Sequence, residues 1–283
     1  MGEHAEQAAP EAEVEQPEEK IALDPNPQRP FTLAIDIGGT GLKASVLSET
    51  GGMVAARVKV ATTYPMPPQG AQGLVTKLAK LVEPLPESDR VSCGFPGMVR
   101  NGHVLGPAHF ARAKGPGSPI DAALVDEWTG FNLAGALGDA LDKPTRVAND
   151  ADIQGMAVVA GKGLELVITL GTGFGTALFL DGALMPHLEL AHHPFRKGGT
   201  YNDQIGELAR KTDGEKKWNE RVREAIGCMK ALFFYDHLYI GGGNARRVDR
   251  DGLGDLIEQI TVVDNTAGIL GGIKLWEGAH LGV

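Results

Sequence analysis

The sequence predicts an α/β protein with two lobes of similar topology that face each other across a cleft. Short apolar strands alternate with helical stretches from Phe31 onward, which is typical of α/β folds. The opening motif, an apolar strand, a Gly/Thr turn and a second apolar strand, occurs twice. Its first glycines, Gly38 and Gly171, are 133 positions apart. This spacing is several-fold longer than a solenoid repeat, so it indicates a duplicated lobe.

The individual elements follow this plan in order along the chain. In the first half, apolar runs bounded by Gly and Pro predict strands at 32–37, 42–47, 54–60, 91–95 and 146–148. Helical spacing of apolar residues predicts helices at 72–82, 133–141 and 153–159. In the second half, strands are predicted at 166–170, 174–180 and 237–240.

The first thirty residues differ in composition from the rest. They carry seven Glu and Asp24 against Lys20 and Arg29, together with five of the 17 prolines. This segment therefore holds a net −6 of the chain's −9 and few large apolar side chains. Such a composition predicts a disordered acidic tail at 1–30. We expect a first lobe at 31–147 and a second at 148–283, with a last helix near 265–278 that packs back on the first lobe.

Composition also narrows the function classes. The acidic balance argues against non-specific nucleic-acid binding. Two cysteines, Cys93 and Cys228, are too few for a disulfide framework or a cysteine-based structural zinc site, and they suit a reducing compartment. The longest apolar run, at 164–170, is too short to span a bilayer, and the N-terminus lacks a signal-peptide pattern. We therefore expect a cytoplasmic protein with no nucleic-acid or membrane partner.

The turn Gly38-Gly39-Thr40 has the composition of a phosphate-binding loop. Glycines let backbone N–H groups converge on an anion, and Thr40 adds a hydroxyl donor. Asp36 at the strand end could hold a water-bridged Mg²⁺, and Lys43 could neutralise phosphate charge. An ordinary hairpin turn is the alternative for this loop taken alone. A Walker loop or a Rossmann fingerprint is not indicated, because a strand follows and not a helix.

Two further glycine-rich turns end predicted strands. One contains Gly171, Thr172 and Gly173, and the other contains Gly241, Gly242 and Gly243. The first is again followed by a strand, so a dinucleotide site is not indicated. Three such turns in one two-lobed chain favour a single phosphate-bearing ligand over three unrelated turns.

Acidic and imidazole side chains supply the candidate chemistry. Asn149-Asp150-Ala151-Asp152 lies just beyond a predicted strand, where α/β sheets place ligand groups. A carboxylate there could take a proton from an attacking hydroxyl. The alternative is that Asp150 or Asp152 caps the following helix.

A second polar cluster follows further along the chain. Glu189 and His192 are three apart, so on a helix they would share one face and could grip sugar hydroxyls. His187 and His193 add a metal-site alternative, which the missing HExxH spacing disfavours.

In this order the motifs resemble the repressor/open-reading-frame/kinase (ROK) family of sugar kinases, and most closely its polyphosphate glucokinases. The resemblance implies the two-lobed actin-like (ribonuclease H-like) hexokinase fold with a central cleft. It spans the body from Phe31 to about Leu275. The motifs that carry it are Ile35-Asp36-Ile37-Gly38-Gly39-Thr40, Gly94-Phe95-Pro96-Gly97, Asn149-Asp150-Ala151-Asp152, Leu170-Gly171-Thr172-Gly173, Glu189-Leu190-Ala191-His192, Ile240-Gly241-Gly242-Gly243 and Asn265-Thr266-Ala267-Gly268.

The resemblance implies a phosphoryl transfer from polyphosphate or ATP to the 6-hydroxyl of glucose, with Asp150 as the general base. The sugar would be held by Asn149, Glu189, His192, Pro96 and Gly97. The phosphates would lie against Gly38, Gly39, Thr40, Lys43, Gly171, Thr172 and Gly173, and an adenosine against Gly241, Gly242 and Gly243. Asp36 would lie near Mg²⁺, and a homodimer is common among such relatives.

Some features depart from the family pattern or leave the donor and the sugar open. No cysteine follows His193, so no structural zinc is expected. Ala191 replaces a usual Gly, and the loop 107–126 lacks the usual Asn-rich sugar segment, so another hexose (mannose or an amino sugar) and a catalytically silent sensor or regulator stay as alternatives.

The donor question turns on a basic stretch. Residues 196–230 hold nine Lys/Arg against six Asp/Glu, which fits either a polyphosphate strip or a solvated helix with mixed-sign pairs.

Overall fold

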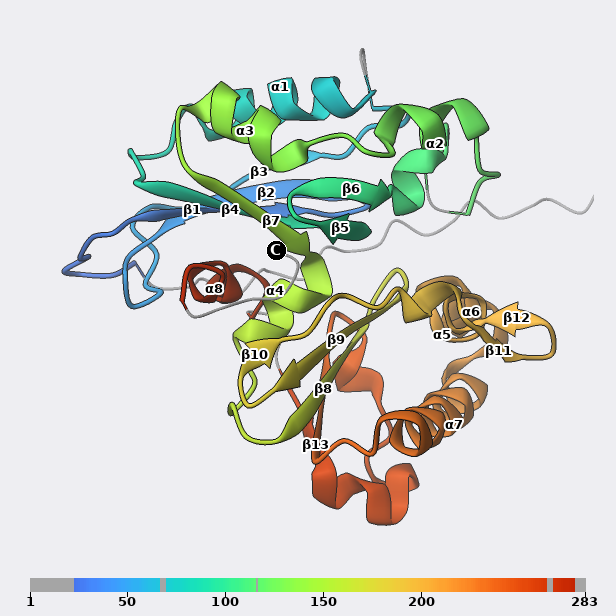
Figure 1. Cartoon of the computed structure of the whole chain (residues 1–283). Helices are drawn as coiled ribbons and strands as arrows, with labels where there is room; N and C mark the ends of the chain where they lie inside the picture. Colours follow the sequence, from blue (N-terminus) through green and yellow to red (C-terminus); the bar gives the residue numbers. More distant parts are fainter. Residues whose placement is uncertain (1–22, 67–69, 116, 264–266, 278–283) are drawn as a thin grey trace, which may run out of the picture.

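The computed structural model describes residues 23–66, 70–115, 117–263 and 267–277. The first lobe is built on a five-stranded sheet in the order β3-β2-β1-β4-β7 (Figure 1). β1, β2 and β3 are antiparallel neighbours, whereas β4 and β7 run parallel to β1. The strands span Thr32–Ile37 (β1), Gly41–Leu47 (β2), Val58–Ala61 (β3), Arg90–Phe95 (β4) and Thr145–Asn149 (β7).

The second lobe repeats this topology, which confirms the predicted duplication. Its sheet has the order β10-β9-β8-β13-β14, with β8, β9 and β10 antiparallel and β13 and β14 parallel to β8. The strands span Leu164–Leu170 (β8), Phe174–Leu180 (β9), Ala183–Leu184 (β10), His237–Gly241 (β13) and Ile260–Val262 (β14).

Helices cover the outer face of each sheet. On the first lobe, the buried side chains of α1 and α3 join the core of the first sheet. On the second lobe, α7 buries Trp218, Val222 and Ile226 against the second core. The helices span Gly70–Val82 (α1), Ala122–Trp128 (α2), Leu133–Leu141 (α3), Tyr201–Ile205 (α5), Glu207–Asp213 (α6) and Glu215–Phe233 (α7).

Short elements complete the two lobes. Within the described ranges, two hairpins form small separate sheets, and short 3₁₀ helices lie in the connections. They span Met98–Arg100 (β5), His103–Gly106 (β6), Pro194–Arg196 (β11), Gly199–Thr200 (β12), Ala108–Ala111 (η1), Leu190–His192 (η2), Ala245–Arg247 (η3) and Asp251–Gln259 (η4).

Two helices lie between the sheets and join the lobes: α4 (Asp150–Met156) and α8 (Ala267–Lys274) (Figure 1). Their contact is close, because a side chain at Gly271 would collide with the backbone of Ile153. Gly272 packs on the first sheet, where its carbonyl accepts a 2.5 Å hydrogen bond from Ser92. The helix at the end of the chain therefore packs back on the first lobe, and it holds α4 in place from behind.

Three local expectations are corrected by the structure. The strand predicted at 54–60 is shorter, because continuous pairing with β2 begins at Val58, while nearer its start the run has one backbone hydrogen bond to β2, from the Val54 N–H to the Val46 carbonyl. The helix predicted at 153–159 begins at Asp150, because the side chain of Asn149 caps it, and it ends at Met156. Residues 23–30, assigned to the tail, are ordered: Ser48 donates to Asp24 at 2.7 Å, and Arg29 pairs with Asp89. The rest of the predicted tail lies outside the described residues.

Among the described residues, no helix is long and apolar enough to cross a membrane.

Candidate active site

The predicted site residues gather where the strands of both sheets end. The carboxyl ends of β1, β4 and β7 lead into Gly38, Pro96 and Asp150, and those of β8 and β13 lead into the other two glycine turns. Parallel strands bring their carboxyl ends to one edge of a sheet, where α/β folds bind ligands. The duplicated topology therefore brings these five sequence motifs to the ends of strands in the two sheets, with α4 lying between the sheets (Figure 1).

The first glycine loop is braced from one side. The Thr62 hydroxyl donates to the Gly38 carbonyl at 2.7 Å, and the Tyr64 hydroxyl donates to the Gly39 carbonyl at 2.8 Å. In a trans peptide the C=O and the next N–H point in opposite directions. The N–H groups of Gly39 and Thr40 therefore point away from this brace, as an anion-binding loop requires. A side chain at Gly38 would lie 2.8 Å from the Gly41 carbonyl oxygen, so the turn needs glycine there.

The second and third glycine loops pack on each other. The Asn244 N–H, just after the third loop, donates to the Leu170 carbonyl at 2.9 Å. Gly242 has a φ of +87°, and a side chain there would collide with the Leu170 backbone. On the other side, the Glu207 N–H donates to the carbonyls of Gly171 and Thr172. The two loops thus form one rigid wall of the second lobe.

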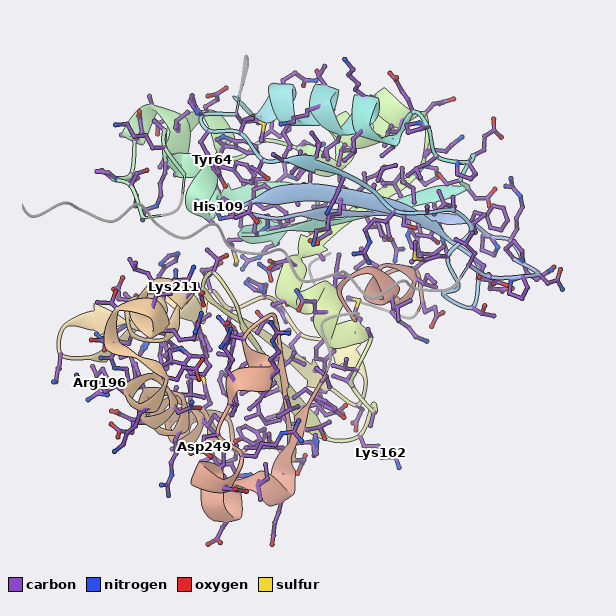
Figure 2. All side chains as sticks on the ribbon, turned by 180° about the vertical axis from the view of Figure 1, so that it is seen from behind. Tyr64, His109, Lys162, Arg196, Lys211 and Asp249 are labelled. Atoms are coloured by element: carbon purple, nitrogen blue, oxygen red, sulfur yellow. The ribbon has the colours of Figure 1, made fainter. Side chains whose placement is uncertain are left out.

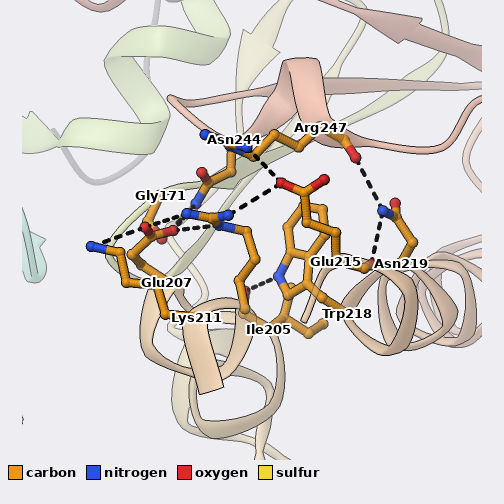
Figure 3. Close-up of polar contacts among 10 residues, drawn as sticks. Gly171, Ile205, Glu207, Lys211, Glu215, Trp218, Asn219, Asn244 and Arg247 are labelled. Carbon is orange, nitrogen blue, oxygen red and sulfur yellow. Dashed lines mark hydrogen bonds and ion pairs between the residues drawn. The ribbon is translucent and has the colours of Figure 1, made fainter. Parts of the chain in front are cut away.

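An ion-pair network lies behind this wall (Figure 3). The Glu207 carboxylate accepts two hydrogen bonds from Arg210, at 2.6 and 2.8 Å, and one from the Asn244 amide at 2.7 Å. The hydrogen bond from Arg210, against a smaller opposing effect of burial, lowers the pKa of Glu207 to about 2. Arg210 and Arg247 both also contact Glu215.

The predicted basic strip at 196–230 runs from β11 into α7, and several of its cations have acidic partners. Arg210 and Lys211 pair with Glu207, Arg221 pairs with Asp213, and Arg196 pairs with Glu224. These contacts favour the mixed-sign interpretation of the stretch over a continuous positive surface.

Asn149, rather than Asp150 or Asp152, is the N-cap of α4, which corrects the capping alternative. Its Oδ1 accepts from the Ala151 N–H at 2.7 Å, and its Nδ2 donates to the Gly97 carbonyl at 3.0 Å. The residue predicted to hold the sugar thus also ties the Pro96-Gly97 turn to the helix. Gly97 itself fits closely against the Gly106 carbonyl, which a side chain there would strike.

Asp150 is the first residue of α4, and its carboxyl titrates in the neutral range. Its surroundings remove water from the carboxyl and Asp36 adds a nearby negative charge, so its pKa rises to about 7. The Ala151 N–H, a 2.8 Å donor to Oδ1, opposes this shift, while Glu189 adds to it. A carboxyl with such a pKa accepts a proton readily near neutral pH.

Asp36 and Lys43 lie directly opposite each other on β1 and β2. Burial raises the pKa of Asp36, and the charges of Lys43 and Arg57 oppose that rise. Among the described residues, no group of three or more His, Cys, Asp or Glu side chains could hold a metal ion. Mg²⁺ commonly uses one or two protein carboxylates and takes its remaining oxygens from water and phosphate. The single carboxylate of Asp36 beside the first loop fits that pattern.

Glu189 directly precedes the short 3₁₀ helix η2 on the second lobe, and His192 is its last residue. Burial opposes ionisation of Glu189, but the ion pair with His187 and the charge of His192 outweigh it, so its pKa is lowered. His187 also contacts Asp152 at 3.0 Å. His192 is exposed at the surface of the lobe. The charge of Glu189 helps to raise the pKa of Asp150, so these two carboxyl groups lie within electrostatic reach of each other.

Two aromatic side chains at the site escaped the sequence analysis. Tyr64 and His109 lie together on the first lobe, with ring centroids 5.9 Å apart (Figure 2). The His109 ring packs against Gly39, its Nε2 is buried without a hydrogen-bond partner, and burial lowers its pKa to about 4. Neither residue belongs to a recurring motif. The loop 107–126, noted for its departure from the expected pattern, was the one signal that pointed toward His109.

A family model described as the ROK family matches residues 32–186, which is more than half of the chain. The chain belongs to the ROK family. Polyphosphate glucokinase of Mycobacterium tuberculosis is 29% identical over 254 residues, covering 84% of this chain and 88% of that protein. N-acetylmannosamine kinase of Escherichia coli is 31% identical over 160 residues, covering 54% of this chain and 49% of that protein.

A solved structure supports the same assignment for this ROK protein. The inorganic polyphosphate/ATP-glucomannokinase of Arthrobacter sp. strain KM superposes with a TM-score of 0.68 at 26% identity, covering 88% of this chain and all of that chain. The expected two-lobed actin-like fold of the sugar kinases is therefore confirmed.

Proposed function

We propose that the protein is a hexose kinase that transfers a phosphoryl group from polyphosphate or ATP to the 6-hydroxyl of glucose, with Asp150 as the base. The observation that carries the proposal is the Asp150 carboxyl, with a pKa of about 7, at the junction of the two lobes. It lies within electrostatic reach of Asp36, on the strand that leads into the first glycine loop, and of Glu189 on the second lobe.

The proposed reaction needs no covalent enzyme intermediate. Asp150 takes the proton from the sugar 6-hydroxyl as that oxygen attacks the terminal phosphorus of the donor. The bridging P–O bond breaks, and a shortened polyphosphate or ADP leaves. The N–H groups of Gly39 and Thr40 would bind the phosphate oxygens that gain charge. Positioning and electrostatics would supply the acceleration.

Sugar binding would fall to Glu189, His192 and the Pro96-Gly97 turn. The ionised Glu189 carboxylate accepts hydrogen bonds from sugar hydroxyls, and His192 can donate one. Mg²⁺, bound with the donor near Asp36, would neutralise phosphate charge.

Similarity to the polyphosphate glucokinase and to the glucomannokinase supports glucose as the first sugar to test and mannose as the second. The N-acetylmannosamine kinase match makes an amino sugar the third. The Gly241–Gly243 turn favours ATP as the donor, and the basic residues of α5–α7 favour polyphosphate, so both donors are included in the test.

The decisive experiment is a matrix of donors and sugars. Purified protein with Mg²⁺ is assayed for sugar 6-phosphate with each donor, using glucose, mannose and N-acetylmannosamine. Asp150→Asn is expected to lower kcat by about 10²–10⁴-fold because the base is lost. Asp142→Asn is the matched control, since Asp142 is exposed and caps α3 at a φ of +51° that Asn also adopts.

Two results would overturn the proposal. No product with any donor and sugar would indicate a silent sugar sensor instead of a kinase. Normal turnover of Asp150→Asn would exclude this carboxyl as the base.

A further inference from the structure

A chain of three polar side chains lies beside the proposed base, and the reaction as described above does not use it. His187 follows β10 and points its two ring nitrogens at two carboxylates. Nδ1 lies 3.0 Å from Oδ1 of Asp152, and Nε2 lies 3.7 Å from Oε2 of Glu189. The side chains of His187 and Asp152 are 5% and 3% exposed, whereas that of Glu189 is 32% exposed.

The geometry assigns a charge to the ring. An imidazole that faces a carboxylate at each nitrogen can donate to both only when both nitrogens are protonated. Burial works against that charge, but the hydrogen bond to Asp152 and the negative charges of Asp152 and Glu189 outweigh it and raise the pKa of His187 to about 10. The ring is therefore a buried cation at neutral pH, held between two acids.

The acidic groups around His187 determine what effect its positive charge has. Asp150 and Asp152 on α4, Glu189 and His192 around η2, and Asp36 on β1 are the titratable groups that share this site. Four of them are acids. Without the buried cation of His187, the negative charges of Glu189 and Asp150 would each favour protonation of the other carboxyl group. A protonated Glu189 would lose acceptor capacity toward sugar hydroxyls.

We propose that His187 is a positioning residue of the sugar site: its imidazolium holds the Glu189 carboxylate in place as an ionised acceptor for sugar hydroxyls, while Asp152 fixes the ring from the other side. This role rests on the hexose-kinase function proposed above. The exposed end of the chain is Glu189, where substrate arrives, and its two buried members support it.

Two substitutions separate the halves of this arrangement. In His187→Asn the amide nitrogen takes the place of Nδ1, so the contact to Asp152 survives while nothing reaches Glu189. In His187→Gln the amide nitrogen reaches the place of Nε2, so a neutral contact to Glu189 returns. His237→Asn is the matched control, because His237 lies at the start of β13, away from the glycine-turn end, and bonds only Thr261 among the described residues.

The first measurement is equilibrium binding of glucose and mannose by calorimetry, which needs no phosphoryl transfer. We expect His187→Asn to raise the sugar Kd and KM by about 10- to 100-fold, because the ion pair that holds Glu189 is lost, with a smaller change in kcat. His187→Gln is expected to recover part of the loss, and His237→Asn to bind like the wild type. A sugar Kd within twofold of wild type in His187→Asn would overturn the proposal.

The second measurement reads the charge directly. In ¹⁵N-histidine NMR spectra recorded across pH, one ring is expected to stay doubly protonated above pH 8, and its signal should be missing in His187→Asn. Asp152→Asn should move that titration to lower pH, which a purely structural role would not require. The proposal fails if no histidine stays protonated above pH 8.

The outcomes also separate this proposal from the kinase function. If sugar binding depends on His187 but the wild type transfers no phosphoryl group, the kinase function is overturned and the positioning role of His187 stands. If the wild type is an active kinase and His187→Asn binds sugar unchanged, the kinase function stands and the positioning role of His187 is overturned. A wild type that binds neither sugar would overturn both.

Discussion

The two glycine hairpins of this protein share a backbone plan but differ in chemistry. Both join an antiparallel strand pair, β1–β2 in the first lobe and β8–β9 in the second. Two residues before the first glycine, however, the first hairpin carries Asp36 and the second carries Thr169. Only the first hairpin therefore brings a negative charge to the proposed base.

Their supports differ as well. The first loop is braced through its carbonyls by hydroxyls of Thr62 and Tyr64, which follow β3. The second is braced by α5 and α6, through the Asn202 side chain and the Glu207 N–H. Duplication has thus preserved the strand topology, while the acid and the braces differ between the two halves. We infer a division of labour, with charge control on the first loop and rigid phosphate support on the second.

The largest change in kcat is expected when the negative charge of the first hairpin is removed. Asp36→Asn should lower kcat by about 10²-fold or more, because an electrostatic group at the phosphates is lost. The matched change in the second hairpin, Thr169→Ser, keeps the hydroxyl beside Gly175 and should leave kcat within a few-fold. Steady-state kinetics on both variants decides the matter. Equal losses in the two would mean that the hairpins are chemically equivalent.

The pH dependence of the wild type gives the next largest effect. Below its pKa of about 7 Asp150 carries a proton and cannot act as a base, so kcat/KM for the sugar should rise with pH up to about 7 and then level off. Because Asp36 contributes to that raised pKa, Asp36→Asn should move the acidic limb to lower pH.

A stability measurement checks the same titration independently. A carboxyl whose pKa is raised on folding from 3.8 to about 7 lowers the free energy of unfolding as pH rises through that window. Asp150→Asn should remove this part of the decline in urea unfolding. A flat kcat/KM profile between pH 5 and 8 would contradict the assignment.

The architecture was predictable because it depends on local patterns that occur twice. The strand at 32–37 and the helix at 133–141 match the structure, since each is bounded by turn or cap residues that the sequence displays. The strand predicted at 54–60 is too long because an apolar segment need not pair continuously: Val54 makes one hydrogen bond to β2, and a regular ladder begins only at Val58. Asp36, Asp150 and Glu189 were named because they belong to motifs with a recognisable order.

The supporting contacts could not be predicted in the same way. Tyr64 reaches Gly39 across 25 positions and His187 reaches Asp152 across 35, and neither spacing has a periodic signature. Such pairs are set by tertiary packing, which sequence spacing does not record. The basic stretch is an intermediate case: its composition fits two alternatives, and the ion pairs of the folded chain favour the one with mixed-sign pairs.

Smaller effects are expected from the braces of the two loops. Tyr64→Phe keeps the ring but leaves the Gly39 carbonyl without its donor, so the donor KM should rise about 3- to 10-fold with little change in Tm. Asn202→Ala leaves the Phe174 N–H unpaired in a buried strand, so it should lower stability by about 1–3 kcal/mol as well as weaken donor binding. Asn202→Asp, which keeps the accepting oxygen, is the control. Thermal unfolding and donor kinetics are measured on both variants. A larger loss of stability in Tyr64→Phe than in Asn202→Ala would contradict the assignment of rigid support to the second loop.

The smallest effect is expected from the exposed cations of α7. Lys216 and Lys217 lie in its first turn, on the stretch whose other cations mostly pair with acids. Exposed charges in such a setting each contribute about 0–1 kcal/mol and are screened by salt. Lys216→Gln with Lys217→Gln should therefore change the KM for polyphosphate by no more than about twofold, even at low ionic strength. A fivefold or larger rise that vanishes in 0.5 M salt, with the KM for ATP unchanged, would instead make α7 a track for a long polyanion. It would extend the second lobe's role from rigid support of the phosphates to selection of the donor.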